Sequence, residues 1–157
     1  MSELAPLFGG NFDWLSTLPS YQQELVNELA KSRAMEDVAI AWLEAGTTSG
    51  IAGFGAAQST RLFYETFLNL MHDLLCSDDK FIEERSKLLA DYKASQTMVA
   101  ASIASIIAPY VGTATPMLTT VVVIILIVIS KAGLQSWCAA QAERRREAGR
   151  PPNENSR

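Results

Sequence analysis

Residues 94–130 read ASQTMVAASIASIIAPYVGTATPMLTTVVVIILIVIS, a stretch of 37 residues without a charged side chain. A membrane-spanning helix needs about 20 apolar residues, so the stretch is too long for one span and about right for two short ones. Pro109, Gly112 and Pro116 lie in its middle, and prolines and glycines grouped in this way are typical of a turn. The sequence therefore predicts a transmembrane helical hairpin that turns at these three residues.

The charges that flank the stretch predict its orientation. The uncharged stretch is divided into a first span over about 94–111 and a second that begins at about 117 and extends to about 137. Lys93 precedes the stretch, and Lys131 with three later arginines follows it. The turn between the spans is uncharged, so the positive-inside rule predicts a membrane protein with both termini in the cytoplasm. The residues expected at the membrane interfaces are Tyr92, Lys93, Tyr110, Lys131, Trp137, Arg144, Arg145 and Arg146.

The two predicted spans differ in character. The first is rich in small side chains at four-residue spacing, which lets helices approach closely and is also compatible with the lining of a narrow pore. The second contains the bulky run Val121–Ile129, which suits contact with lipid on all sides. The candidates for helix packing or pore lining are Ala100, Ala101, Ala104, Ser105 and Ala108.

The charges of the whole chain fall into three blocks. Residues 1–93 carry 14 acidic and 7 basic side chains, whereas residues 131–157 carry 3 acidic and 6 basic ones. We expect an acidic soluble helical domain over 1–93, the hairpin over 94–137, and a basic, partly disordered cytoplasmic tail over 138–157. The acidic head argues against nucleic acid as a partner.

Helical patterns fill the acidic head, so the sequence predicts an all-α fold. Ser20 begins a capping box, and a first helix is expected over about 20–45. A second is expected over about 57–75, and Ser77–Asp79 has the composition of the start of a third. No helix breaker lies between that start and Ala108, so we expect the third helix to continue into the first span.

No residue pattern predicts catalysis or a cofactor. The glycines of residues 50–55 have the order GxxGxG without the strand that a nucleotide-binding loop needs, so a linker is the better interpretation. His72 and Cys76 share a helix face, but zinc needs three or four ligands. Glu83 and Glu84 are adjacent and point in different directions, as on a solvated helix face. We expect neither an enzyme nor a metal site.

The two cysteines, Cys76 and Cys138, lie far apart in the sequence and form no recognisable disulfide framework. We expect them to be reduced, as in a cytosolic protein. Acylation of Cys138 beside a membrane is an alternative, although an incidental thiol is the simpler interpretation.

The apolar stretch resembles the hydrophobic hairpin of colicin-type pore-forming domains, because two uncharged helices meet at a turn rich in Gly, Pro and Thr. The resemblance covers about a quarter of the chain and includes no motif. It implies a helical bundle that keeps the hairpin in its core while the protein is in water. Such a bundle inserts the hairpin into a membrane only when triggered. The remaining helices look too few to cover the hairpin within one chain.

Three functions fit this layout. The first is an oligomerising membrane effector that forms a pore or disrupts the lipid bilayer under the control of its helical head. Small toxins of bacterial self-killing systems share such a layout, which is an analogy only. The second is a membrane-anchored adaptor whose head docks a partner protein. The third is a soluble helical oligomer that buries the hairpin between subunits.

Overall fold

The computed structural model describes residues 4–8, 12–50, 56–112 and 115–149, with the backbone alone for Ala5, 46–50, 56–59 and 115–117. Helices make up this part of the chain, and it contains no strand, so the all-α prediction is confirmed. The α-helices are α1 (Ser20–Ala30), α2 (Met35–Gly50), α3 (Ala56–Cys76), α4 (Ile82–Ala94), α5 (Val99–Val111), α6 (Thr115–Ala132) and α7 (Leu134–Ala148). The 3-10 helices are η1 (Ala5–Phe8), η2 (Trp14–Thr17) and η3 (Gln96–Met98).

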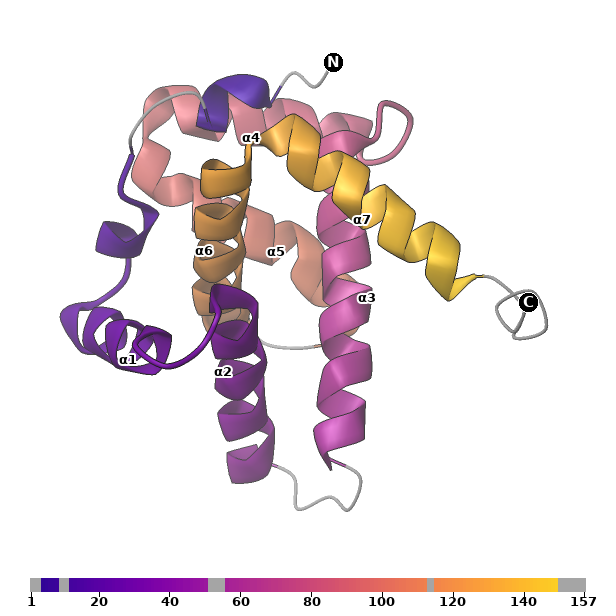
Figure 1. Cartoon of the computed structure of the whole chain (residues 1–157). Helices are drawn as coiled ribbons and strands as arrows, with labels where there is room; N and C mark the ends of the chain where they lie inside the picture. The colour runs from indigo at the N-terminus through magenta and orange to yellow at the C-terminus, as the bar shows by residue number, and fades with distance from the viewer. Residues whose placement is uncertain (1–3, 9–11, 51–55, 113–114, 150–157) are drawn as a thin grey trace.

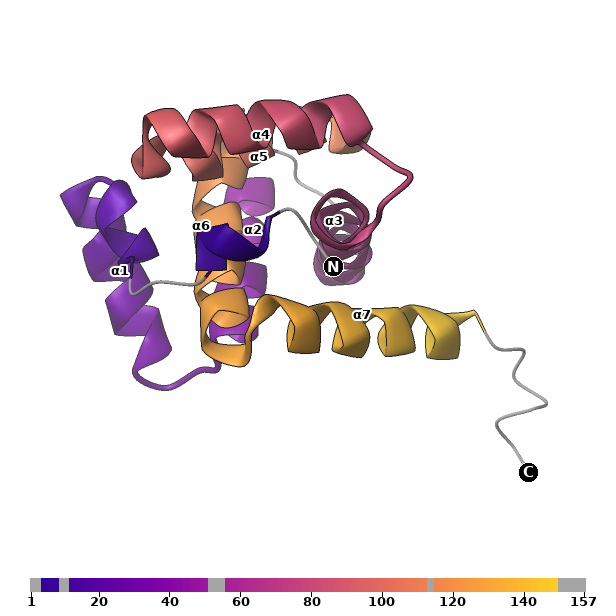
Figure 2. The same ribbon diagram turned by 90° about the horizontal axis from the view of Figure 1, so that it is seen from above.

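Helix α6 stands at the centre of the bundle. Seen from above, α5 and α7 lie on opposite sides of it, with α1 and α3 on its two flanks (Figure 2). Helix α2 runs beside it (Figure 1), and α6 packs against α5, α2, η2 and α7. The six side chains of Val121–Leu126 have no exposed surface. A helix buried on every side needs neighbours on every side, and the other helices of this chain are those neighbours. The expectation that one chain has too few helices to cover the hairpin is therefore wrong.

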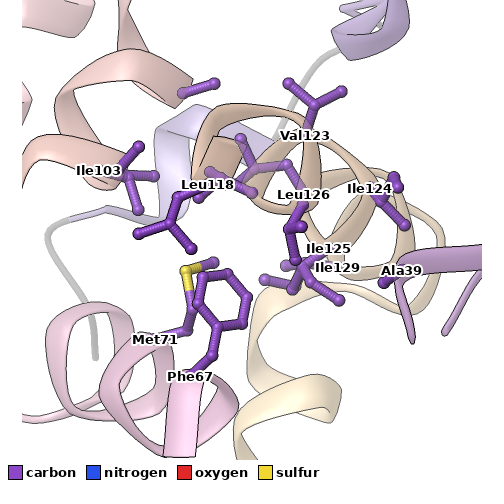
Figure 3. Close-up of a cluster of buried hydrophobic side chains, with 14 of the residues drawn as sticks. Ala39, Phe67, Met71, Ile103, Leu118, Val123, Ile124, Ile125, Leu126 and Ile129 are labelled. Carbon is purple, nitrogen blue, oxygen red and sulfur yellow. The ribbon is translucent and has the colours of Figure 1, made fainter. Parts of the chain in front are cut away.

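Side chains from three other helices converge on α6 (Figure 3). Phe67 and Met71 point toward it from α3 and Ile103 from α5, while Ala39 of α2 and Ile124 of α6 belong to two helices that pack side by side. All five are completely buried and belong to one hydrophobic cluster. The acidic head and the apolar hairpin therefore share a single core.

The turn of the hairpin begins at Gly112. Its φ of 70° lies in the left-handed region, which glycine adopts without the steric cost that a Cβ atom brings. Its N–H donates to the Ala108 carbonyl at 2.9 Å and closes the last turn of α5. Pro109 lies within α5, and Pro116 lies in the first turn of α6, where proline is tolerated. Residues 113–114 lie outside the described part of the chain.

The first predicted helix, over about 20–45, is divided in two. Lys31–Ala34 separate α1 from α2, without a glycine or proline to signal the break. The capping box is only half present, because Pro19 occupies the N-cap position and Ser20 makes no capping hydrogen bond. The Gln23 amide reaches back instead to the Leu18 carbonyl at 2.8 Å. The second predicted helix agrees closely with α3.

The predicted continuous helix from the head into the first span is also wrong. Helix α4 begins at Ile82, after a turn in which the Ser77 hydroxyl accepts the backbone N–H groups of Asp79 and Lys80. It ends at Ala94, because Ser95 has an extended backbone with φ −163° and ψ 119°. Since the chain reverses there through η3, the head and the hairpin are not mechanically continuous.

The second predicted span, over about 117–137, is broken at Gly133. Helices α6 and α7 meet there at an angle of 110°. In the described part of the chain, no single helix is long and apolar enough to cross a membrane. The pair Leu118–Ala132 and Leu134–Ala148 meets that requirement only together, by length and composition. An unbroken span over 117–137 is therefore wrong, and the transmembrane hairpin stays a prediction.

One buried cation holds the end of α3. Arg85 is 5% exposed, and its Nε donates to the Leu74 carbonyl at 3.0 Å. One Nη atom donates to the carbonyls of Lys80 at 2.6 Å and Asp73 at 3.4 Å. A cation suits this position, because the last carbonyls of a helix lack intrahelical partners and carry partial negative charge.

Replacing Arg85 by methionine should therefore destabilise the protein. Arg85→Met leaves buried carbonyls without donors, and we expect the free energy of unfolding to fall by about 2–4 kcal/mol. Lys87→Met, on the exposed side of the same helix, should change it by less than about 0.5 kcal/mol. Urea denaturation of the two variants measures the difference, and equal stabilities would contradict a capping role for Arg85.

Candidate functional site: the buried hairpin and the α3–α7 junction

The small residues of α5 divide between its two faces. Ala100 and Ala104 are buried against the bundle, and Ala108 is half-buried. Ala101 and Ser105 are exposed on the opposite side. One row of small residues is thus already used for packing, and the second is open to contact. Whether either row packs helices or lines a pore in a membrane stays a prediction.

Three side-chain hydrogen bonds between the hairpin and the outer helices are seen in the part of the chain that the structure describes. In each, one polar side chain of the hairpin meets one of an outer helix. These hydrogen bonds run from the Ser102 hydroxyl to Asp91 Oδ2 of α4 (2.7 Å), from the Thr120 hydroxyl to Gln22 Oε1 of α1 (2.8 Å), and from Trp14 Nε1 of η2 to the Ser130 hydroxyl (2.9 Å). A single hydrogen bond contributes about 1 kcal/mol net, so these contacts orient the outer helices more than they fix them.

A disulfide joins α3 to α7. Cys76 is the last residue of α3 and Cys138 lies in the second turn of α7, with their Cα atoms 5.8 Å apart and both side chains half-buried. The expectation of two reduced cysteines is therefore wrong. The sequence could not show the pairing, because 62 residues separate the two and only the 110° bend at Gly133 brings them together. Disulfides persist in oxidising compartments and are rare in the cytosol.

Polar contacts extend the α3–α7 junction, by which we mean the disulfide and the residue pairs on the facing sides of the two helices. Gln141 Nε2 donates to Asn69 Oδ1 at 3.1 Å, and Arg145 Nη1 donates to Asp73 Oδ1 at 2.8 Å. Gln141 is 4% exposed, and its Oε1 atom has no hydrogen-bond partner among the described residues. Burying an unpaired carbonyl oxygen is unfavourable, so the contact of α7 with α3 is not optimised for stability.

A second helix also contacts α7. Arg144 donates from both Nη atoms to the Glu36 carboxylate of α2, at 3.3 Å each. Tyr64 donates to the same carboxylate at 3.3 Å, and burial raises the pKa of its phenol. These residues line a cleft of about 600 Å³ between α2, α3 and α7. The arginines expected to anchor the chain to lipid are therefore partly engaged with the bundle.

His72 lies at the centre of the junction. Arg145 Nη1 is 3.0 Å from its Nδ1 atom, and the ring faces Trp137 with 6.3 Å between the ring centroids. Arginine has only donors, so Nδ1 must accept this hydrogen bond and the ring must be neutral. Burial and the positive charge of Arg145 lower the pKa of His72, while Asp73 opposes that change.

The remaining predicted interface residues lie at the surface or at helix ends. Lys93 and Lys131 are exposed, and Tyr110 is 59% exposed and forms a T-shaped ring pair with Phe81. The Tyr92 hydroxyl donates to the Pro6 carbonyl, and Arg146 pairs with Glu143. Trp137 differs, because it is 6% exposed inside the junction.

Two features of the candidate site were not predicted from the sequence. The first is the bend at Gly133, where a lone glycine in a helical pattern indicates nothing certain. The second is the polar face of α7, for which Cys138, Gln141 and Arg145 at three- and four-residue spacing are the signal. Among the described residues, no group of three or more His, Cys, Asp or Glu side chains could hold a metal ion. His72 and Cys76 in particular do not form one, since Cys76 is in the disulfide.

Acid should weaken the junction. Because the pKa of folded His72 is below its usual value of 6.5, the unfolded chain binds more protons there, and stability is lost as the pH falls through 6.5 toward the folded pKa. The chain contains one histidine, so His72→Gln should remove this slope between pH 7.5 and 5.5. Urea denaturation across that range measures it, and an identical slope in the variant would refute the assignment.

Comparison with known proteins adds no relative. No family model, curated protein or solved structure matches the chain. A function has to follow from the residues themselves, and the two features that need explanation are an uncharged helix enclosed on all sides and a covalent tie at the base of α7.

Proposed function

We propose that this protein is an oligomerising membrane effector that stores its α5–α6 hairpin inside a helical bundle in water and inserts it into a lipid bilayer. The observation that carries the proposal is the complete burial of Val121–Leu126, an uncharged segment whose whole circumference is suited to lipid. Within the bundle, protein side chains occupy the positions that acyl chains would take. Release of the outer helices would leave this segment no favourable environment in water.

The length of α6 suits a bilayer only when this helix is extended. Helix α6 has 18 residues, which corresponds to about 27 Å, against a hydrocarbon core of about 30 Å. Continued to Trp137 as one helix, it would have a length of roughly 35 Å. Lys131 would lie within that length, but its long side chain can reach the headgroups. The charged residues at both ends would then keep the two termini on one side.

The hydroxyl groups of the hairpin are compatible with transfer to lipid. Ser102, Thr120 and Ser130 would each lose one hydrogen bond to an outer helix. Serine and threonine in a helix can hydrogen-bond to the carbonyl of the preceding turn, so none of them needs to remain unpaired. The hairpin has no charged side chain between Lys93 and Lys131 that would oppose insertion.

Contact between copies would follow from the small residues of α5. The row of Ala101 and Ser105 is exposed in the bundle, and the row of Ala100 and Ala104 would become available when the outer helices leave. Small residues at four-residue spacing promote close helix packing in membranes, where the hydrophobic effect no longer drives association. We therefore propose that the inserted hairpins form homo-oligomers.

A membrane-anchored adaptor is the second candidate function. Tyr21 and Leu25, four residues apart on α1, are 63% and 49% exposed and form an apolar face for a protein partner. An adaptor would need the hairpin only as a tether, so vesicles would bind the protein but would not leak.

A charge at the tip of the hairpin should separate these functions. Tyr110→Lys places a cation where it must cross the bilayer, at a cost of about 2.5–3.5 kcal/mol, so dye release from anionic vesicles should slow on the order of 100-fold. Tyr21→Lys is the matched control, because Tyr21 is similarly exposed but lies on α1. Thermal unfolding of both variants confirms that they fold.

The same assay is run on the oxidised and the reduced protein. Release by wild type and Tyr21→Lys, with slow release by Tyr110→Lys, supports the effector. Equal dye release by the two variants would mean that the tip of the hairpin does not cross the bilayer. Binding without release supports the adaptor, and a protein that remains in the soluble fraction in both redox states refutes membrane insertion.

A further inference from the structure

We propose that the Cys76–Cys138 disulfide is a redox latch, which holds α7 against α3 and thereby keeps α6 and α7 bent at Gly133. Its reduction would allow α6 and α7 to join into one helix long enough to span a bilayer. The membrane role of the latch rests on the proposed function, whereas its action on α7 can be measured in water.

A single residue carries the bend. The Gly133 N–H donates to the Ile129 carbonyl at 2.7 Å, and the Gly133 carbonyl accepts the Trp137 N–H at 3.0 Å. The helical hydrogen bonds therefore continue up to Gly133 from α6 and away from it into α7. Gly133 itself has φ 90° and ψ 139°, a conformation that L side chains rarely adopt. A change of backbone torsion at this residue would convert two helices into one.

The disulfide is incompatible with the straight form. Cys138 lies about five residues beyond the bend, so straightening an angle of 110° would move its Cα atom by roughly 12 Å relative to α6. A disulfide restricts its two Cα atoms to a separation of about 4.4–6.8 Å. Helix α7 therefore cannot straighten while Cys138 is bonded to Cys76 and α3 keeps its place in the bundle.

The other contacts of α7 are reversible. Among the described residues, they include the hydrogen bonds from Gln141 to Asn69 and from Arg145 to His72, the ion pairs of Arg144 and Arg145 with Glu36 and Asp73, and the packing of the buried Trp137 ring. The side chains of both ion pairs are partly exposed, and such pairs are weak and screened by salt. Once the covalent bond is broken, these contacts can open and close without further chemistry.

The reductant is a dithiol. One thiolate attacks a sulfur of the disulfide, which breaks the S–S bond, releases one cysteine as a thiolate and leaves a mixed disulfide on the other. The second thiol of the reductant then displaces the remaining cysteine and closes its own disulfide. Two electrons and two protons pass to the protein, which ends with thiols at Cys76 and Cys138. Dithiothreitol supplies this chemistry in the test.

The latch is tested first in water, by hydrogen exchange of backbone amides. Dithiothreitol should lower the protection of α7 by at least about 10-fold while α6 stays protected, and a Cys76→Ser/Cys138→Ser variant should match the reduced protein without reductant. Equal protection of α7 in the oxidised and reduced forms would overturn the latch, whatever the vesicles show. A uniform loss of protection in all helices would also overturn it, because the disulfide would then stabilise the fold as a whole.

The second test concerns the bend and uses insertion into anionic vesicles. Gly133→Ala disfavours the positive φ of the bent form and favours a continuous helix, so the reduced variant should insert on the order of 10-fold faster than reduced wild type. Gly112→Ala is the matched control, because Gly112 also has a positive φ and open space around it but lies at the hairpin turn. It should not insert faster.

The outcomes separate the two proposals. Faster insertion of the reduced protein, increased further by Gly133→Ala alone, supports both. Equal insertion by the oxidised and reduced forms overturns the latch and leaves the effector intact. Reduction could lower the protection of α7 while neither the oxidised nor the reduced protein inserts into vesicles. That result overturns the effector function and leaves the latch as a device that acts in water.

Discussion

The enclosure of α6 determines the rest of this structure. Six consecutive side chains, Val121–Leu126, are completely buried, and each large apolar side chain removed from water contributes about 1.5–3 kcal/mol. One helix can cover only one side of its neighbour. Several elements therefore pack around α6, namely α5, α2, η2 and the long side chains of α3. The amphipathic outer helices are arranged around this segment, and their polar faces remain in solvent.

Under the proposed function, the bundle is one of two environments that α6 can occupy. An uncharged helix of valine, isoleucine and leucine is almost equally suited to a protein interior and to a bilayer, so hydrophobicity alone does not decide between them. Specific contacts decide instead. Besides their apolar packing, α1, α4 and η2 each contribute one side-chain hydrogen bond to the hairpin among the described residues, whereas a covalent bond holds α7 to α3. The disulfide lies five residues beyond the bend at Gly133, where the latch that we propose would control the length of the apolar helix.

The sequence predicted what depends on local pattern. The all-α class, the bounds of α3 and the turn at Gly112 follow from hydrophobic periodicity and from glycine. The breaks at Lys31–Ala34 and Ser95 lack such residues, since tertiary packing imposes them. The disulfide and the buried environment of Trp137 depend on the direction of α7, which the two backbone torsions of Gly133 set. Apolar composition could not distinguish lipid from protein as the surroundings of α6, because both are apolar.

The most direct measurement follows the neighbours of α6 by methyl NMR, in water and in anionic lipid nanodiscs under reducing conditions. In water, the methyl groups of Val121–Ile129 should show nuclear Overhauser effects to Ala39, which is buried on α2, the helix that packs along α6. A stored hairpin predicts that these effects disappear in nanodiscs and that effects to lipid acyl chains replace them. Retention of the Ala39 contact, with no effect to lipid, would contradict it and would make α6 the permanent core of a closed bundle.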